Sequence, residues 1–198
     1  MKPSRGHGDA GQAFPIYITV VGGLLFLAFA YLAVGQAAAN RNSAQTAADA
    51  AALAAAQDTR DQLAGEWVEQ VLDPTQWQDI FDGYAPGLVE SCGRAHQLAG
   101  LNDANVTVCK PGPLEYEVTV KTIQSVGDSI VPGTEAYHST ESAIAVIEPR
   151  CSFKPLEEDA ADDELPQLTC KDRDWVLDPE DLTDLPEPED LFDVHLAD

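Results

Sequence analysis

Basic side chains are scarce in this sequence of 198 residues. Lys and Arg total 11 against 34 Asp and Glu, which gives a formal net charge of -23 at pH 7. Non-specific nucleic-acid binding draws most of its affinity from cations that neutralise phosphates, so we exclude that class and expect no nucleic-acid partner. The imbalance is steepest in residues 151–198, which hold 17 acidic and 3 basic residues.

Motifs that carry catalysis are also lacking. The sequence has no G-x-S-x-G elbow, no G-x-x-x-x-G-K phosphate loop and no C-x-x-C pair, and its four histidines show no metal-ligand spacing. We therefore expect no enzymatic activity, no catalytic or metal site and no cofactor.

Charged residues are absent between Asp9 and Arg41. Within this stretch, 12 of the 22 residues 13–34 are Leu, Ile, Phe or Val. As a helix these residues span about 33 Å, close to one hydrocarbon core. Their side chains favour insertion by on the order of -5 kcal/mol. We predict a transmembrane helix over residues 13–34 that binds membrane lipid.

Orientation follows from the charges that flank the span. Lys2 and Arg5 precede it, so the positive-inside bias places residues 1–12 in the cytoplasm and the C-terminal part outside the cell membrane. Two other interpretations compete with the single-pass anchor. One is a signal peptide cleaved after the small residues 37–39, and the other is a buried core helix.

Proline is absent between Pro15 and Pro74, and 12 of the residues 37–56 are alanine, the best helix former. We predict that the helix continues as an Ala-rich extension over residues 35–73. Small side chains recur along it at helical spacing and suit close packing on a partner helix. Simple helix propensity without a partner is the other interpretation. The candidate packing residues are Ala44, Ala47, Ala48, Ala51 and Ala55.

Residues 75–150 predict a small extracytoplasmic α+β domain with a helix followed by an antiparallel sheet. Alternating apolar residues favour strands, and Pro-Gly pairs mark the turns between them. A domain of this size has a marginal core. The expected helix covers residues 86–100, and the expected strands cover residues 105–110, 114–124 and 138–147.

Residues 151–198 form an acidic tail with five prolines. Self-repulsion and low apolar content favour a mostly irregular, solvated segment. Apolar residues are nevertheless spaced among the acids, so docking on a partner or on the chain's own sheet is the alternative. These apolar residues are Trp175, Val176, Leu177, Leu182, Leu185, Leu191 and Phe192.

All four cysteines follow the predicted span, and an even number on an oxidising side indicates two disulfides. Cys92–Cys109 with Cys151–Cys170 is the favoured pairing. The pairing of Cys92 with Cys151 and of Cys109 with Cys170 stays open as an alternative that would tie the tail to the domain.

An ordered set of residues surrounds the apolar run. Gly11 and Gln12 precede it, and the string RNSAQTAADAAALAAA follows it from residue 41 to residue 56. This pattern resembles the N-terminal region of the TadE/TadG-like proteins of the tight-adherence (Flp) pilus system. Besides Gly11 and Gln12, the residues that carry the resemblance are Arg41, Asn42, Gln45, Asp49 and Leu53.

The resemblance implies a non-enzymatic pilus-assembly component with a pilin-like layout, in which a long helix leads into a sheet. Its partners would be pilus or secretion-machinery proteins, other pilin-like helices among them. The rival hypotheses are a structural envelope protein unrelated to pili, whose acidic tail binds a basic partner or cations, and a secreted protein released by cleavage.

Overall fold

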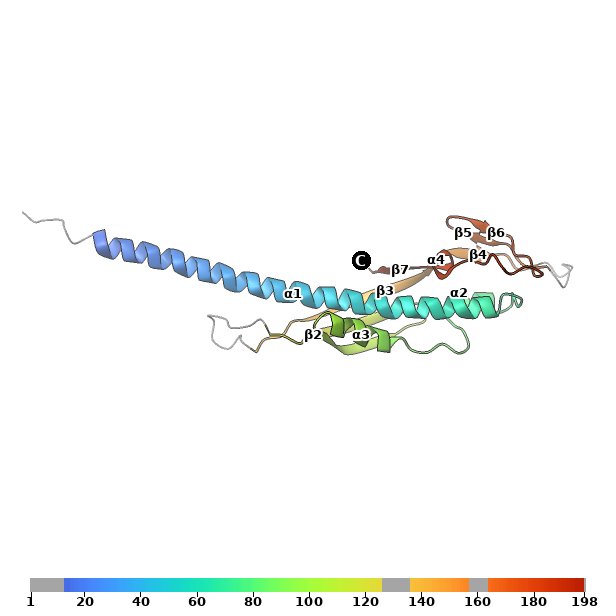
Figure 1. Cartoon of the computed structure of the whole chain (residues 1–198), viewed down its shortest axis with the longest axis horizontal. Coiled ribbons are helices and arrows are strands. Elements are labelled where there is room, and N and C mark those ends of the chain that lie inside the picture. Colours follow the sequence, from blue (N-terminus) through green and yellow to red (C-terminus); the bar gives the residue numbers. More distant parts are fainter. Residues whose placement is uncertain (1–12, 126–135, 157–163, 198) are drawn as a thin grey trace, which may run out of the picture.

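A single helix, α1 (Ala13–Glu69), runs through most of the length of the molecule (Figure 1). The computed structural model describes residues 13–125, 136–156 and 164–197. The 57 residues of α1 correspond to a rod of about 85 Å. Residues 70–72 form turns, and Pro74 follows them. Pro74 is the first proline after Pro15, and because a proline disfavours helical conformation in the residue before it, α1 ends ahead of it.

Four antiparallel strands form the main sheet in the order β1-β2-β3-β7. They are β1 (Ala104–Pro111), β2 (Glu115–Thr122), β3 (Thr140–Pro149) and β7 (Phe192–Leu196). The first three confirm the strands predicted from alternation. On β2 every second residue from Tyr116 onward is buried, so one face of the strand forms the core.

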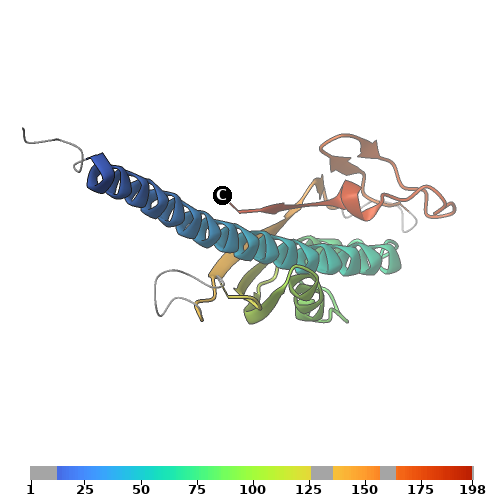
Figure 2. The ribbon, with the colours of Figure 1, turned by 60° about the vertical axis from the view of Figure 1, so that its left-hand side comes forward.

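The second half of α1 lies across this buried face of the sheet, with contacts to all four strands (Figure 2). A second helix, α3 (Cys92–Leu101), lies alongside α1 and also contacts β1. The layout is therefore α+β, with a long N-terminal apolar helix and a small antiparallel domain, as the sequence predicts. The first half of α1 extends beyond the domain.

Helix α3 begins six residues later than the predicted range of 86–100. Gly87 has φ +84°, a left-handed conformation that interrupts a helix. The side chain of Gln62 on α1 then accepts a hydrogen bond from Val89 N (2.8 Å) and donates one to Val89 O (3.1 Å). These bonds hold the chain extended against α1, so the helix starts only at Cys92.

An aromatic cluster closes the end of the domain that lies farthest from residue 13. Its ring centroids are 5.2–6.2 Å apart, in tilted and edge arrangements. One short helix, α2 (Trp77–Phe81), which the sequence analysis did not predict, supplies two of the rings. The cluster consists of Trp67, Trp77, Phe81, Phe153 and Phe192.

The acidic tail is folded where it is described. It forms a three-stranded sheet of β4 (Cys151–Phe153), β5 (Leu168–Cys170) and β6 (Asp174–Trp175), followed by α4 (Pro188–Leu191) and β7. The sequence analysis preferred a solvated tail, and this interpretation is wrong for the described residues. They follow the alternative interpretation, in which the tail docks on the chain's own sheet.

The physical reason for this correction is the placement of the tail's apolar residues. Leu191 and Phe192 are 0% exposed, and β7 pairs with β3 as the fourth strand of the main sheet. The boundary expected at residue 150 therefore does not separate two structural units. All the described acidic residues of the tail except the half-buried Asp190 are exposed, so solvent and salt screen their repulsion while the apolar residues pack inward.

Candidate functional site

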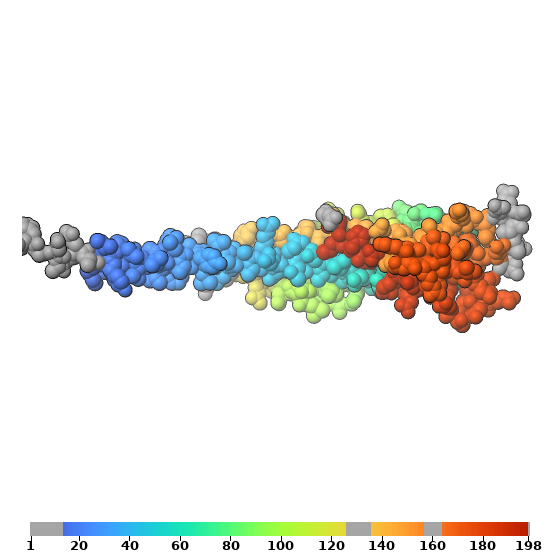
Figure 3. Space-filling model, turned by 90° about the horizontal axis from the view of Figure 1, so that it is seen from above, coloured from blue at the N-terminus to red at the C-terminus, as the bar shows by residue number. Residues whose placement is uncertain are grey.

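The first half of α1 is the most exposed apolar surface of the molecule. Within the described residues, α1 is the helix long and apolar enough to cross a membrane, and none of its most apolar window is buried. Phe26 is 69% exposed and Tyr31 is 84% exposed. The space-filling view shows this half as a bare rod beside the domain (Figure 3). A soluble helix would not leave such a surface in water.

The candidate packing residues Ala44, Ala47, Ala48, Ala51 and Ala55 lie on the second half of α1, where all five are 0% exposed. They are covered by the chain's own domain, so the structure does not leave this stripe open to a partner helix. Their small size brings the helix axis close to the sheet. Leu63 and Trp67 continue the same face toward the aromatic cluster.

A polar junction marks the point where α1 enters the domain, and it is centred on Asn40. Its Nδ2 donates to Gln124 O (3.3 Å), and its Oδ1 accepts from Ser139 N (3.3 Å) and lies 3.5 Å from Thr122 Oγ1. These bonds attach the helix to the end of β2 and the approach to β3. The sequence analysis did not single out Asn40, although it lies next to the family string.

The residues of the family string surround this junction. Arg41 forms an ion pair with Glu141 of β3 (2.8 Å), and Gln45 donates to Asp49 one turn along the helix (2.7 Å). Leu53 is partly buried against the core. The string therefore has both polar contacts near the exit of the helix and packing contacts deeper in the domain.

Three family residues remain, of which one lines a hollow in the surface and two belong to the N-terminal segment. Asn42 lines a hollow of about 490 Å³ together with Asn40, Leu101 and Gln124. Its walls carry amides, hydroxyls and one carboxylate. The predicted site residues Gly11 and Gln12, and the segment 1–12, lie outside the described residues.

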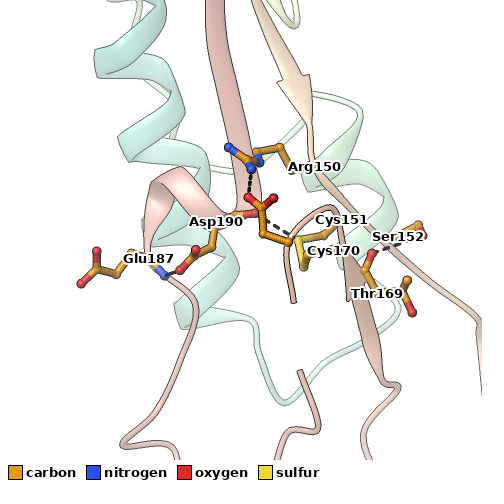
Figure 4. Close-up of a disulfide and its surroundings, with 8 residues drawn as sticks. Arg150, Cys151, Ser152, Thr169, Cys170, Glu187 and Asp190 are labelled. Atoms are coloured by element: carbon orange, nitrogen blue, oxygen red, sulfur yellow. Dashed lines mark hydrogen bonds and ion pairs between the residues drawn. A yellow bond between two sulfur atoms is a disulfide. The ribbon is translucent and has the colours of Figure 1, made fainter. Parts of the chain in front are cut away.

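Two disulfides staple the domain. Cys92 at the start of α3 is bonded to Cys109 on β1, and Cys151 is bonded to Cys170 on the paired strands β4 and β5. This is the favoured one of the pairings that the sequence left open. Figure 4 shows the second bond close to α4, where Glu187 N donates to the Asp190 carboxylate (2.9 Å).

A buried polar cluster joins α1 to the sheet, and the sequence analysis missed it. The Tyr116 hydroxyl accepts from Thr59 Oγ1 (2.9 Å) and from Ser91 N (3.1 Å), and Ser91 Oγ donates to Asp58 (2.7 Å). Thr59, Ser91 and Tyr116 satisfy one another inside the core, with the half-exposed Asp58 at its edge, so the cluster fixes the relative position of α1, α3 and β2. The sequence signal for this cluster was Thr59, a hydroxyl-bearing residue on the alanine-rich face of α1.

Ionisable groups on the described surface show little that suggests catalysis. Glu148, Asp193 and His195 bring ligand atoms within 4.8 Å of one another on β3 and β7, but all three are exposed, and we assign no metal to them. The Thr183 hydroxyl (2.6 Å) and N–H (3.2 Å) donate to Asp181 and hold the pKa of this carboxyl below its usual range.

The fold and the exposed apolar helix define a class of protein: a small extended domain carried on one helix of membrane-spanning length. Residues 11–58 match the family described as putative Flp pilus-assembly TadE/G-like. This match confirms the resemblance over the N-terminal region. No curated protein and no solved structure matches the chain.

Proposed function

We propose that this chain is a single-pass envelope protein that takes part in the assembly of an Flp-type pilus through contacts with other proteins. The observation that carries the proposal is the family match over residues 11–58, because that range holds the exposed apolar half of α1 and the string that joins it to the domain. The family is structural rather than catalytic, which agrees with the absence of catalytic motifs in the sequence.

In this proposal residues 13–34 lie in the bilayer, residues 1–12 face the cytoplasm and the folded domain lies outside. Lys2 and Arg5 before the span support this orientation. The two disulfides support it as well, since such bonds persist in oxidising compartments.

Partner contacts within the bilayer use the bare half of α1 in this proposal, because the alanine stripe is covered by the chain's own domain. A Cβ added at Gly22 or Gly23 would meet nothing within 4 Å, so both glycines are open to a neighbouring helix. Glycines at such a position allow close backbone approach in membranes. We expect Gly23→Leu to weaken association with partner helices, and Ala28→Leu, at another exposed position on α1, to serve as the matched control.

Co-purification from solubilised membranes tests the proposal. The full chain should be retained in the membrane after carbonate washing and should bring down other proteins of the pilus machinery. A variant with Leu25→Arg and Phe26→Arg places two charges at the centre of the span, at a cost of about 5–7 kcal/mol, and should lose membrane retention. Retention of this variant, or capture of envelope proteins unrelated to pili by the native chain, would contradict the proposal.

Orientation is tested with Val176→Cys, at a position that is 83% exposed in the folded tail. The native cysteines are all in disulfides, so the new thiol is the reactive one among the described residues. A membrane-impermeant maleimide should label it in intact spheroplasts. Labelling only after lysis would reverse the proposed orientation.

A further inference from the structure

Three exposed apolar side chains gather at the end of the domain that faces the bare half of α1. Leu101 is the last residue of α3 and is 73% exposed, Ile123 follows β2 and is 50% exposed, and Tyr137 precedes β3 and is 65% exposed. We call these three residues the proximal rim. Leu101 ends α3, and the other two residues lie in the chain that leaves β2 and enters β3, on the same side of the domain.

The contacts of the rim place it at the level of Asn40 on α1. Leu101 lines the same hollow as Asn40, and Ile123 N donates to Asp103 O (2.8 Å) beside it. Ser139, two residues after Tyr137, is hydrogen-bonded to Asn40 (3.3 Å). In Figure 1 the end of β2 and the start of β3 lie on the side of the domain that faces the bare half of α1.

Distance along the helix relates the rim to the bilayer. Asn40 lies six residues after Val34, the last residue of the predicted span, which is about 9 Å of helix. The interfacial region adds about 5–7 Å on each side of the hydrocarbon core. The level of Asn40 therefore lies about 2–4 Å beyond the headgroups, and a side chain that extends this far from that level toward the span reaches them.

The chemistry of this end of the domain fits a lipid surface. Tyr is a typical interfacial side chain, since its ring is apolar and its hydroxyl stays hydrated. Arg41 and Lys121 are exposed near the rim and offset the carboxylates of Asp103 and Glu141, in a chain whose net charge is -23. Because the charges near the rim offset one another, the rim can approach anionic headgroups without strong repulsion, although the domain as a whole is acidic.

We propose that the proximal rim rests in the headgroup region of the membrane and contacts phospholipid directly. The inference rests on the proposed insertion of residues 13–34 and adds a second membrane contact, made by the folded domain. Two contacts limit the tilt of α1, since tilting the helix would move the rim out of the lipid or deeper into it.

A fluorescent probe at Gln124→Cys tests the proposal, because this exposed residue lies beside the rim and leaves its three side chains intact. The same probe at Val176→Cys, in the folded tail, is the matched control. The purified full chain is reconstituted into vesicles of phosphatidylcholine and phosphatidylglycerol that carry a headgroup spin label. Quenching at position 124 should be severalfold stronger than at position 176.

The rim itself is tested by adding Ile123→Glu and Tyr137→Glu to the Gln124→Cys protein. Quenching should fall toward that of the control, with membrane retention and both disulfides unchanged. Equal quenching at positions 124 and 176 in a chain that resists carbonate washing would overturn the proposal while leaving the anchor in place. A chain that carbonate removes from the vesicles would overturn the anchor, and the rim contact with it.

Discussion

Substitution of Ala51 by Leu tests whether the alanine stripe is part of the chain's own core. Ala51 is 0% exposed on the half of α1 that lies across the sheet. Leu adds three carbons at a fully buried position, and overpacking of this kind costs about 1–3 kcal/mol. A loss of about 2 kcal/mol changes the unfolding equilibrium roughly 30-fold, a large share of a net stability of about 5–15 kcal/mol.

The assay is urea unfolding of the detergent-solubilised full chain, followed by the fluorescence of the tryptophans in the aromatic cluster. With a denaturant slope of about 2 kcal/mol/M, the midpoint should fall by about 1 M. Ala38→Leu is the matched control, because Ala38 lies on the same helix but is exposed outside the domain. Equal midpoints for the two variants would refute the buried placement and favour a face that packs on a partner helix.

Three regions of the domain and one carboxyl group give further predictions. Phe192→Ala leaves a cavity in the aromatic cluster and should lower stability by about 3–5 kcal/mol in the same urea assay. Cys170→Ser opens the 19-residue loop and should cost about 3 kcal/mol, measured with and without a reducing agent. Asn40→Ala removes the hydrogen bonds to Gln124 O and Ser139 N, while Ser139 N keeps Thr122 Oγ1 as an acceptor (3.1 Å), so the substitution should cost about 0.5–1.5 kcal/mol per lost bond and should speed amide exchange at the start of β3. Asp181 loses its hydroxyl donor in Thr183→Ala, so its NMR titration midpoint should rise; in the native chain its stabilising contribution is present above its unfolded pKa and disappears as pH falls through the lower folded value.

Much of the fold could be predicted because the relevant signals are local. The uncharged run and the alanines without a proline predict α1 from composition, and the alternation from Tyr116 to Val120 predicts β2 from its period. The family string likewise lies in one continuous segment. These features do not depend on what the segment packs against.

The remaining features depend on tertiary contacts, and no local pattern reports them. Small residues at helical spacing suit a partner helix and the chain's own sheet equally well, so the stripe at Ala51 could not be assigned. Phe192 follows a run of acids and prolines, and its burial depends on pairing with β3, more than 40 residues earlier in the chain. Helix α2 is five residues long, which is too short to show a period.

The continuity of α1 has a mechanical consequence for the proposed function. Asn40 is the sixth residue after Val34, and the helix passes between them without a break. The hydrogen bonds of Asn40 attach the far end of this short segment to the sheet. The domain therefore cannot swing freely on a flexible linker, as it could with a Gly/Ser-rich connection. In the proposed function, a partner bound to the span in the bilayer would set the tilt of α1, and the same tilt would set the direction in which the domain points outside.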